Sequence, residues 1–231
     1  MFLSRVRLNP ARRSSRPVLA SPHVLHAAVL AAFPDPSPRA TGRVLWRLDT
    51  DATSATVYVV SPEQPDFTHL VEQAGWPSLP EGWIVRPYGP LLSRITQGQH
   101  YRFRLTANPV RSTRSPESES GARGKVFGHV TVAQQTDWLL SRAERLGFAI
   151  ARTSAGHDTD ERPLVPAPHL SVTNSGTVSF SRRETRVTLR VATYEGLLEV
   201  TSPEDFRRTL THGIGRAKGY GCGLLTIAPA S

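Results

Sequence analysis

The sequence predicts an α+β fold, and three observations lead to it. Short segments in which apolar and polar residues alternate, as in half-buried strands, recur along the whole chain. Segments with the apolar spacing of helices separate them. The order β-α-β-β-α-β occurs twice, once on each side of residues 88–98. This is the order of the ferredoxin-like (RRM-like) fold, so we expect two such domains in tandem, 1–94 and 95–231.

The first half of the chain contains four predicted strands and two predicted helices. It opens with Phe2–Leu8, where apolar and polar residues alternate. Ser21 and Pro22 form a helix-start signal, because serine caps an amino end and proline fits the first helical position. That helix places Leu25, Ala28, Val29 and Ala32 on one face and ends at Pro34. The remaining elements are strands Arg43–Leu48 and Ala55–Val60, helix Asp66–Ala74 and strand Trp83–Val85.

The second half follows the same plan with insertions. Residues 111–125 have the composition of a flexible polar loop, and residues 153–168 are too interrupted for a regular element. Thr177–Phe180 and Arg186–Ala192 are predicted to form a hairpin, which Gly196–Val200 continues or pairs with. The other expected elements are strand His100–Ala107, helix Gln134–Leu146 ended by Gly147, strand Phe148–Arg152, helix Pro203–Leu210 capped by Ser202, and strand Leu224–Ile227.

Charge narrows the classes of function. The 231 residues carry a net charge of +9, which favours a polyanion or an anionic membrane surface as partner; a basic enzyme from a GC-rich genome is the alternative.

No apolar segment is long enough to span a bilayer. The single cysteine, Cys222, excludes an intramolecular disulfide and a cysteine-based zinc site. We expect a cytoplasmic nucleic-acid-binding protein that does not bind membranes.

The segment Gly213–Gly223 is the most distinctive part of the sequence. Its five glycines surround Arg216, Lys218 and Tyr220. Such loops bring backbone N–H groups close to an anion, while the basic side chains add charge and tyrosine offers a stacking face. A dinucleotide site or a P-loop would need a strand before the loop and a helix after it, and this loop has neither. The pattern therefore predicts contact with a phosphate backbone.

Five segments, in this order, resemble one family. They are Met1–Val6, Leu25–Val29 leading to Phe33-Pro34, Tyr101–Pro109, Tyr194–Leu198 and Gly213–Leu225. Together they resemble the CasE family, the CRISPR repeat-RNA endoribonucleases of type I-E Cascade complexes. The resemblance implies tandem ferredoxin-like domains and metal-independent cleavage of repeat RNA at the 3′ base of its stem-loop, with no cofactor. It also implies that the protein keeps its product and stays with the other Cascade subunits.

The resemblance directs attention to two histidines. His26 matches the family's catalytic histidine, and it falls beside the apolar face of its helix. The family has a tyrosine where this chain has His23, which lies three residues away and is thus a neighbour on the helix surface. RNA carries its own nucleophile, the 2′-OH, so cleavage needs a base, an acid and positive charge. Our hypothesis is that His23 is the base, because the helix dipole favours its neutral form, and His26 the acid.

Two other readings of these histidines stay open. His26 could be a boundary histidine that makes one hydrogen bond. The pair could also be half of a metal site, although no third ligand is evident nearby.

Basic residues elsewhere are candidates for RNA binding. They are Arg102 and Arg104 on the outer face of a strand, Arg182, Arg183 and Arg186 at the hairpin tip, and Arg216 and Lys218 in the glycine-rich loop. Solvated surface charge is the alternative for the strand pair. The competing functions are a non-catalytic RNA-binding module of the same fold and a small phosphoesterase, whose two His-x-Thr motifs this sequence lacks.

Overall fold

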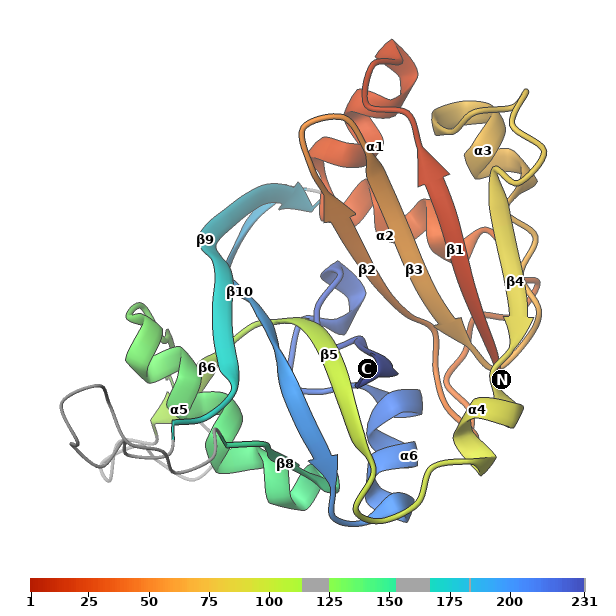
Figure 1. The fold of residues 1–231 in the computed structure, drawn as a ribbon. Coiled ribbons are helices and arrows are strands. Elements are labelled where there is room, and N and C mark those ends of the chain that lie inside the picture. The colour runs from red at the N-terminus through yellow and green to blue at the C-terminus, as the bar shows by residue number, and fades with distance from the viewer. Residues whose placement is uncertain (114–124, 153–166, 183, 231) are drawn as a thin grey trace, which may run out of the picture.

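The computed structural model describes residues 1–113, 125–152, 167–182 and 184–230. Two antiparallel sheets follow one another along the chain, each with helices against it (Figure 1). Among the described residues, no helix is both long and apolar enough to cross a bilayer.

The first sheet has the strand order β2-β3-β1-β4. Its strands are β1 (Phe2–Leu8), β2 (Leu45–Thr50), β3 (Ala55–Ser61) and β4 (Trp83–Pro87), and its helices are η1 (Arg13–Ser15, a 3₁₀ turn), α1 (Arg16–Ala20), α2 (Pro22–Leu30) and α3 (Thr68–Ala74). Helix α4 (Gly89–Ser93) follows this sheet in the chain.

The second sheet has the order β11-β5-β10-β8, and β9 also pairs with β10. Its strands are β5 (His100–Ala107), β8 (Phe148–Ile150), β9 (Leu170–Arg182), β10 (Thr185–Val200) and β11 (Leu225–Pro229), and its helices are α5 (Val132–Ala143), η2 (Glu144–Leu146), α6 (Pro203–His212) and η3 (Lys218–Tyr220). The central strands are β1 and β3 in the first sheet, and β5 and β10 in the second. The predicted α+β fold class is confirmed, and the order of the strands agrees with the predicted tandem ferredoxin-like arrangement.

Local signals set several of the element ends. The Ser21 hydroxyl accepts a hydrogen bond from the Val24 N–H at 3.5 Å, so the predicted cap of α2 is present. Ser202 caps α6 in the same way by accepting from Asp205 N. Helix α5 starts two residues earlier than predicted, because Thr131 and Gln134 form a reciprocal capping box there.

Some predicted bounds were wrong. The ends of the segment 111–125 are not loop, because β6 (Val110–Thr113) pairs with β7 (Lys125–Gly128). Strand β2 begins at Leu45 instead of Arg43, whose backbone N–H donates to Thr211 O outside the sheet. Of the two alternatives for Gly196–Val200, continuation is correct, since this segment is the end of β10.

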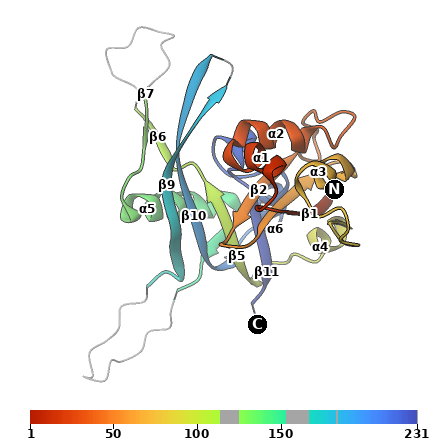
Figure 2. The same cartoon turned by 90° about the horizontal axis from the view of Figure 1, so that it is seen from above.

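The β9–β10 hairpin extends beyond the second sheet as an arm. Residues 185–191 of β10 pair with β9 alone, whereas β5 pairs with β10 only from Ala192 onward. Figures 1 and 2 show this arm reaching past the sheet toward α1 and α2. Near its tip the Phe180 ring packs on Tyr220 of η3, with 4.8 Å between the ring centroids. The arm is thereby held against the glycine-rich loop.

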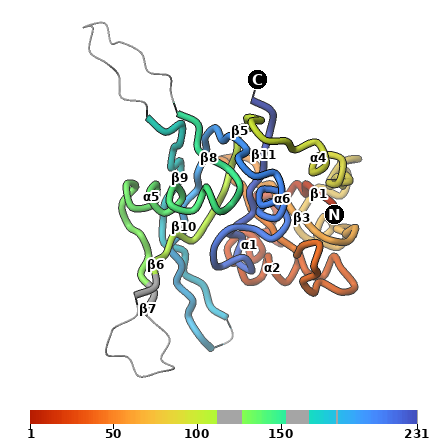
Figure 3. The backbone as a smooth tube through the Cα atoms, turned by 90° about the horizontal axis from the view of Figure 1, so that it is seen from below, coloured from red at the N-terminus to blue at the C-terminus, as the bar shows by residue number. Residues whose placement is uncertain are grey.

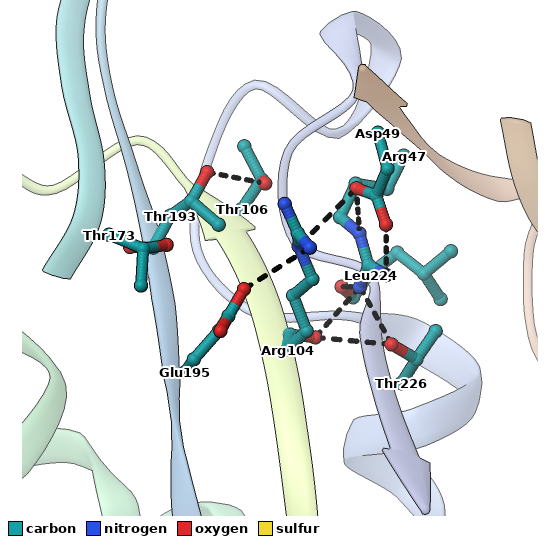
Figure 4. Close-up of polar contacts among 9 residues, drawn as sticks. All are labelled: Arg47, Asp49, Arg104, Thr106, Thr173, Thr193, Glu195, Leu224 and Thr226. Carbon is teal, nitrogen blue, oxygen red and sulfur yellow. Dashed lines mark hydrogen bonds and ion pairs between the residues drawn. The ribbon is translucent and has the colours of Figure 1, made fainter. Parts of the chain in front are cut away.

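Arg47 joins the two sheets. Its side chain is 2 % exposed, and its Nε and Nη2 donate to both carboxylate oxygens of Asp49 at 2.8 and 2.9 Å. Its Nη1 reaches into the second sheet (Figure 4). There it donates to Arg104 O at 2.7 Å, Thr226 Oγ1 at 2.8 Å and Leu224 O at 3.3 Å. A buried arginine with this many acceptors fixes strand β2 relative to β5 and β11.

The apolar cores also connect the two sheets. One core lies under the first sheet and includes Val6, Leu25 and Trp46. The other lies under the second sheet, yet it also takes in Leu45 and Val60 from the first. The predicted boundary at residue 94 falls after α4, and the division into two domains stays a prediction.

We predict that Arg47→Met destabilises the protein by about 3–5 kcal/mol, because it leaves Asp49 and several carbonyl oxygens without their buried partner. Urea unfolding followed by circular dichroism measures the change. Arg86→Met, at an exposed position of β4, is the matched control and should stay within about 0.5 kcal/mol of the wild type. Equal stability of the two variants would contradict the bridging role of Arg47.

Candidate active site

His26 projects from α2 and is held by an indole. The Nε1–H of Trp46 donates a hydrogen bond to His26 Nδ1 at 3.1 Å. The two rings are nearly parallel, with 23° between their planes and 6.4 Å between their centroids. Trp46 lies in β2 and is 2 % exposed, whereas His26 is half-buried. The histidine is therefore anchored on one ring edge, and its Nε2 edge is the one that can meet a ligand.

The glycine-rich loop of the second half lies against this histidine. A Cβ added at Gly219 would stand 3.2 Å from His26 Nε2. Figures 2 and 3 show the loop, in blue, beside the red helix α2. The sequence predicted phosphate contacts for this loop, but it gave no sign of the contact with His26. Because residue 219 is glycine, it places no side chain against the Nε2 edge.

Gly221 is the second residue at which the loop comes close to the His26–Trp46 pair. Its φ is +78°, a conformation that favours glycine, and a Cβ there would lie 2.7 Å from Trp46 Cζ3. The loop thus packs on both members of the His26–Trp46 pair, at Gly219 and at Gly221. Each of these two glycines allows packing that a larger residue would prevent.

Positive charge gathers around His26. Burial lowers the pKa of His26, and the nearby His23, Arg43 and Arg182 lower it further. His23 comes from the same helix, and Arg182 comes from the tip of the hairpin arm. The histidine is consequently neutral near pH 7 in the free protein, in a setting that attracts an anion.

One further basic residue, Lys218, completes this cluster. Lys218 of η3 is half-buried, and burial together with Arg43 lowers the pKa of Lys218. Sequence reasoning missed Arg43, because a residue at the start of a predicted strand carries no sign that it will approach a distant helix. Arg43 Nε is buried without a hydrogen-bond partner. We use the term cationic cluster for Arg43, Arg182 and Lys218.

The predicted RNA-binding residues divide between two places. Arg182 and Lys218 belong to the cationic cluster, Arg186 is exposed on the hairpin arm and Arg216 is exposed in the loop. Arg183 lies outside the described residues.

Arg102 and Arg104 share one face of β5, as predicted, but the structure does not bring them to His26. Both line a groove of about 820 Å³ between the two sheets, on the side of β2 that carries Arg47 instead of Trp46. Arg104 already pairs with Glu195 at 3.2 Å and Asp49 at 3.6 Å (Figure 4). RNA binding by these two arginines stays a prediction.

The arrangement can hold a phosphodiester and move protons next to it. The Nε2 of His26 lies beside Gly219, a second imidazole lies on the same helix, and cations from three separate segments stand nearby. In the part of the chain that the structure describes, no three His, Cys, Asp or Glu side chains form a group that could hold a metal ion.

Comparisons with known proteins agree on one family. The family described as CRISPR associated protein matches residues 1–229. CRISPR-associated endoribonuclease Cse3 of Thermus thermophilus is 29 % identical over 238 aligned residues, which cover 99 % of this chain and 100 % of that protein. CRISPR system Cascade subunit CasE of Escherichia coli is 28 % identical over 131 residues, 55 % of this chain and 57 % of that protein. A structure of Cse3 bound to 19 nt RNA superposes with a TM-score of 0.74 and 28 % identity, covering 99 % of this chain and 100 % of that one.

We predict that Arg182→Gln raises the pKa of His26, because it removes a positive charge that opposes protonation of the ring. Arg186→Gln, close by in the same hairpin, should leave the pKa unchanged, since Arg186 is not among the charges that act on His26. Titration of the His26 ring protons by NMR measures both. If both variants shift the pKa alike, Arg182 has no special place at the site.

Proposed function

This chain belongs to the family of CRISPR associated proteins, and we propose that it is a metal-independent endoribonuclease that cleaves CRISPR repeat RNA at the 3′ base of its stem-loop. The resemblance to the CasE family is confirmed by the family match and by the relatives named Cse3 and CasE. The Thermus relative is named an endoribonuclease, and it covers nearly the whole chain.

One observation carries the proposal. His26 has its Nε2 beside Gly219 and lies near positive groups that come from the segment before β2, the hairpin arm and the glycine-rich loop. A phosphodiester is the ligand that suits this combination, because it is anionic and its cleavage needs proton transfer. Once bound, the phosphate charge would offset the cations and bring the pKa of His26 upward again.

The reaction needs no group from outside the RNA and the protein. The 2′-oxygen of the nucleotide before the cut attacks phosphorus, and His23 takes the proton from that hydroxyl. The P–O5′ bond breaks, and the 5′-oxygen receives a proton from the Nε2 side of His26. The products are a 2′,3′-cyclic phosphate and a 5′-hydroxyl. The cationic side chains stabilise the negative charge on the phosphorane.

The rest of the protein would hold the stem-loop. A-form RNA presents mainly backbone and shape, and arginine binds phosphates with two parallel hydrogen bonds. We assign this binding to Arg182, Arg183 and Arg186 of the hairpin arm, and to Arg216 and Lys218 of the loop. The Escherichia coli relative is named a Cascade subunit, and we propose that this chain likewise keeps its product and acts within a Cascade complex in the cytoplasm.

We predict discrete cleavage of a stem-loop repeat RNA by the wild-type protein in EDTA, with a 2′,3′-cyclic phosphate on the product. His26→Ala should reduce single-turnover cleavage by a factor of about 10²–10⁴ and leave RNA binding intact. His23→Phe tests the proposed base, and we expect single-turnover cleavage by this variant to be slower than that by the wild type as well. The control is His100→Ala, because His100 is an exposed residue at the start of β5.

Each variant has an outcome that overturns part of the proposal. Binding without cleavage by the wild type would indicate the alternative, a non-catalytic RNA-binding module. Normal cleavage by His26→Ala would remove this residue from the site. An unchanged rate for His23→Phe would contradict the two-histidine scheme while leaving the role of His26 intact.

A further inference from the structure

The ring of Trp46 contacts both His26 and the glycine-rich loop. Its Nε1–H donates to His26 Nδ1 at 3.1 Å, and its six-membered ring faces Gly221. An indole nitrogen can only donate a hydrogen bond. Nδ1 of His26 must therefore accept, so in the neutral ring the proton resides on Nε2.

This protonation state matters because of where Nε2 lies. Nε2 is the nitrogen beside Gly219, where the loop places no side chain of its own. With Nδ1 engaged by Trp46, His26 offers an N–H at this edge and no lone pair. A base needs a lone pair, whereas a group that assists a leaving oxygen needs an N–H.

Contacts on both faces of strand β2 keep Trp46 in place. Gly221 packs on its ring, and a Cβ at that position would come within 2.7 Å of Cζ3. The next residue, Arg47, points to the opposite face of β2 and is bound by β5 and β11. The indole therefore has little freedom to release His26.

We propose that Trp46 is a positioning residue that holds His26 in its Nε2–H form, which gives His26 the donor role at the leaving oxygen and leaves the base role to His23. This inference rests on the proposed ribonuclease function for its roles. Its structural core, the protonation state of His26, can be measured without RNA.

The surrounding charges act on the same ring. His23 on α2, Arg43 before β2 and Arg182 on β9 all oppose protonation of His26. Lys218 and Tyr220 are the titratable groups of η3, the 3₁₀ turn of the loop that packs against α2. Trp46 adds an uncharged effect in the same direction, because its N–H stabilises the lone pair on Nδ1. Replacing only the indole separates this effect from that of the charges.

The first experiment uses the full wild-type chain with ¹⁵N-labelled histidine, free of RNA. Long-range ¹H–¹⁵N correlation spectra distinguish a protonated ring nitrogen from an unprotonated one. We expect protonated Nε2 and unprotonated Nδ1 for His26 at pH 7.5. The reverse pattern, or an even mixture of the two forms, would overturn the proposal with no variant required.

The second experiment compares Trp46→Phe with Trp138→Phe. Phenylalanine keeps an aromatic ring but removes the N–H. For Trp46→Phe we expect a mixture of both neutral forms, titration of His26 at a higher pH, and cleavage at least about tenfold slower with RNA binding retained. Trp138 is a matched control, since it is also buried and packs on Gly215 of the same loop. Trp138→Phe should leave the protonation state of His26 as it is in the wild type.

The outcomes keep the two proposals apart. If the wild type shows the Nε2–H form but does not cut stem-loop RNA, the proposed function fails and the assignment of the ring stands. If the wild type cuts RNA and Trp46→Phe retains both the Nε2–H form and the wild-type rate, the positioning role of Trp46 fails and the function stands. The unchanged signals of the other histidines report that each variant is folded.

Discussion

The packing of the glycine-rich loop on the His26–Trp46 pair is the contact on which the rest of this structure depends. Helix α2 and strand β2 belong to the first half of the chain, and the loop belongs to the second. Neither half presents the complete site by itself. The two sheets must keep one relative position, and the buried Arg47 bridge between β2, β5 and β11 fixes it. The Phe180–Tyr220 contact then adds the hairpin arm to the same assembly.

The two faces of β2 show different electrostatic arrangements. On the face of Arg47, positive and negative side chains alternate, since Arg47 pairs with Asp49 and Arg104 pairs with Asp49 and Glu195 (Figure 4). On the face of Trp46 the cationic cluster lies near His26. Among ion pairs between described residues, none includes Arg43, Arg182 or Lys218. The balanced face serves to join the sheets, and the other face is suited to an anion.

Much of the fold could be predicted because its signals are local. The caps at Ser21 and Ser202 and the alternation in β1 are visible in a few adjacent residues. The strands β6 and β7 were missed, since a segment rich in Arg, Ser, Glu and Gly has the composition of a loop whether or not its ends pair.

The site was less accessible to sequence reasoning. His26 was found only through a family resemblance, because a histidine beside an apolar helix face is common. The contacts of His26 with Trp46 and Gly219 join residues 20 or more positions apart, and no local pattern records such contacts. Arg43 escaped notice for the same reason. The glycines were correctly singled out, but three of them, Gly215, Gly219 and Gly221, also lie close to aromatic rings.

The most direct test of this account is a structure of the full chain with a stem-loop repeat RNA that carries a 2′-deoxy nucleotide at the cleavage site. The account predicts that the scissile phosphate lies within hydrogen-bonding distance of His26 Nε2, between α2 and the glycine-rich loop, with the Trp46–His26 hydrogen bond intact. A scissile phosphate bound in the groove between the two sheets, beside Arg102 and Arg104, would contradict it.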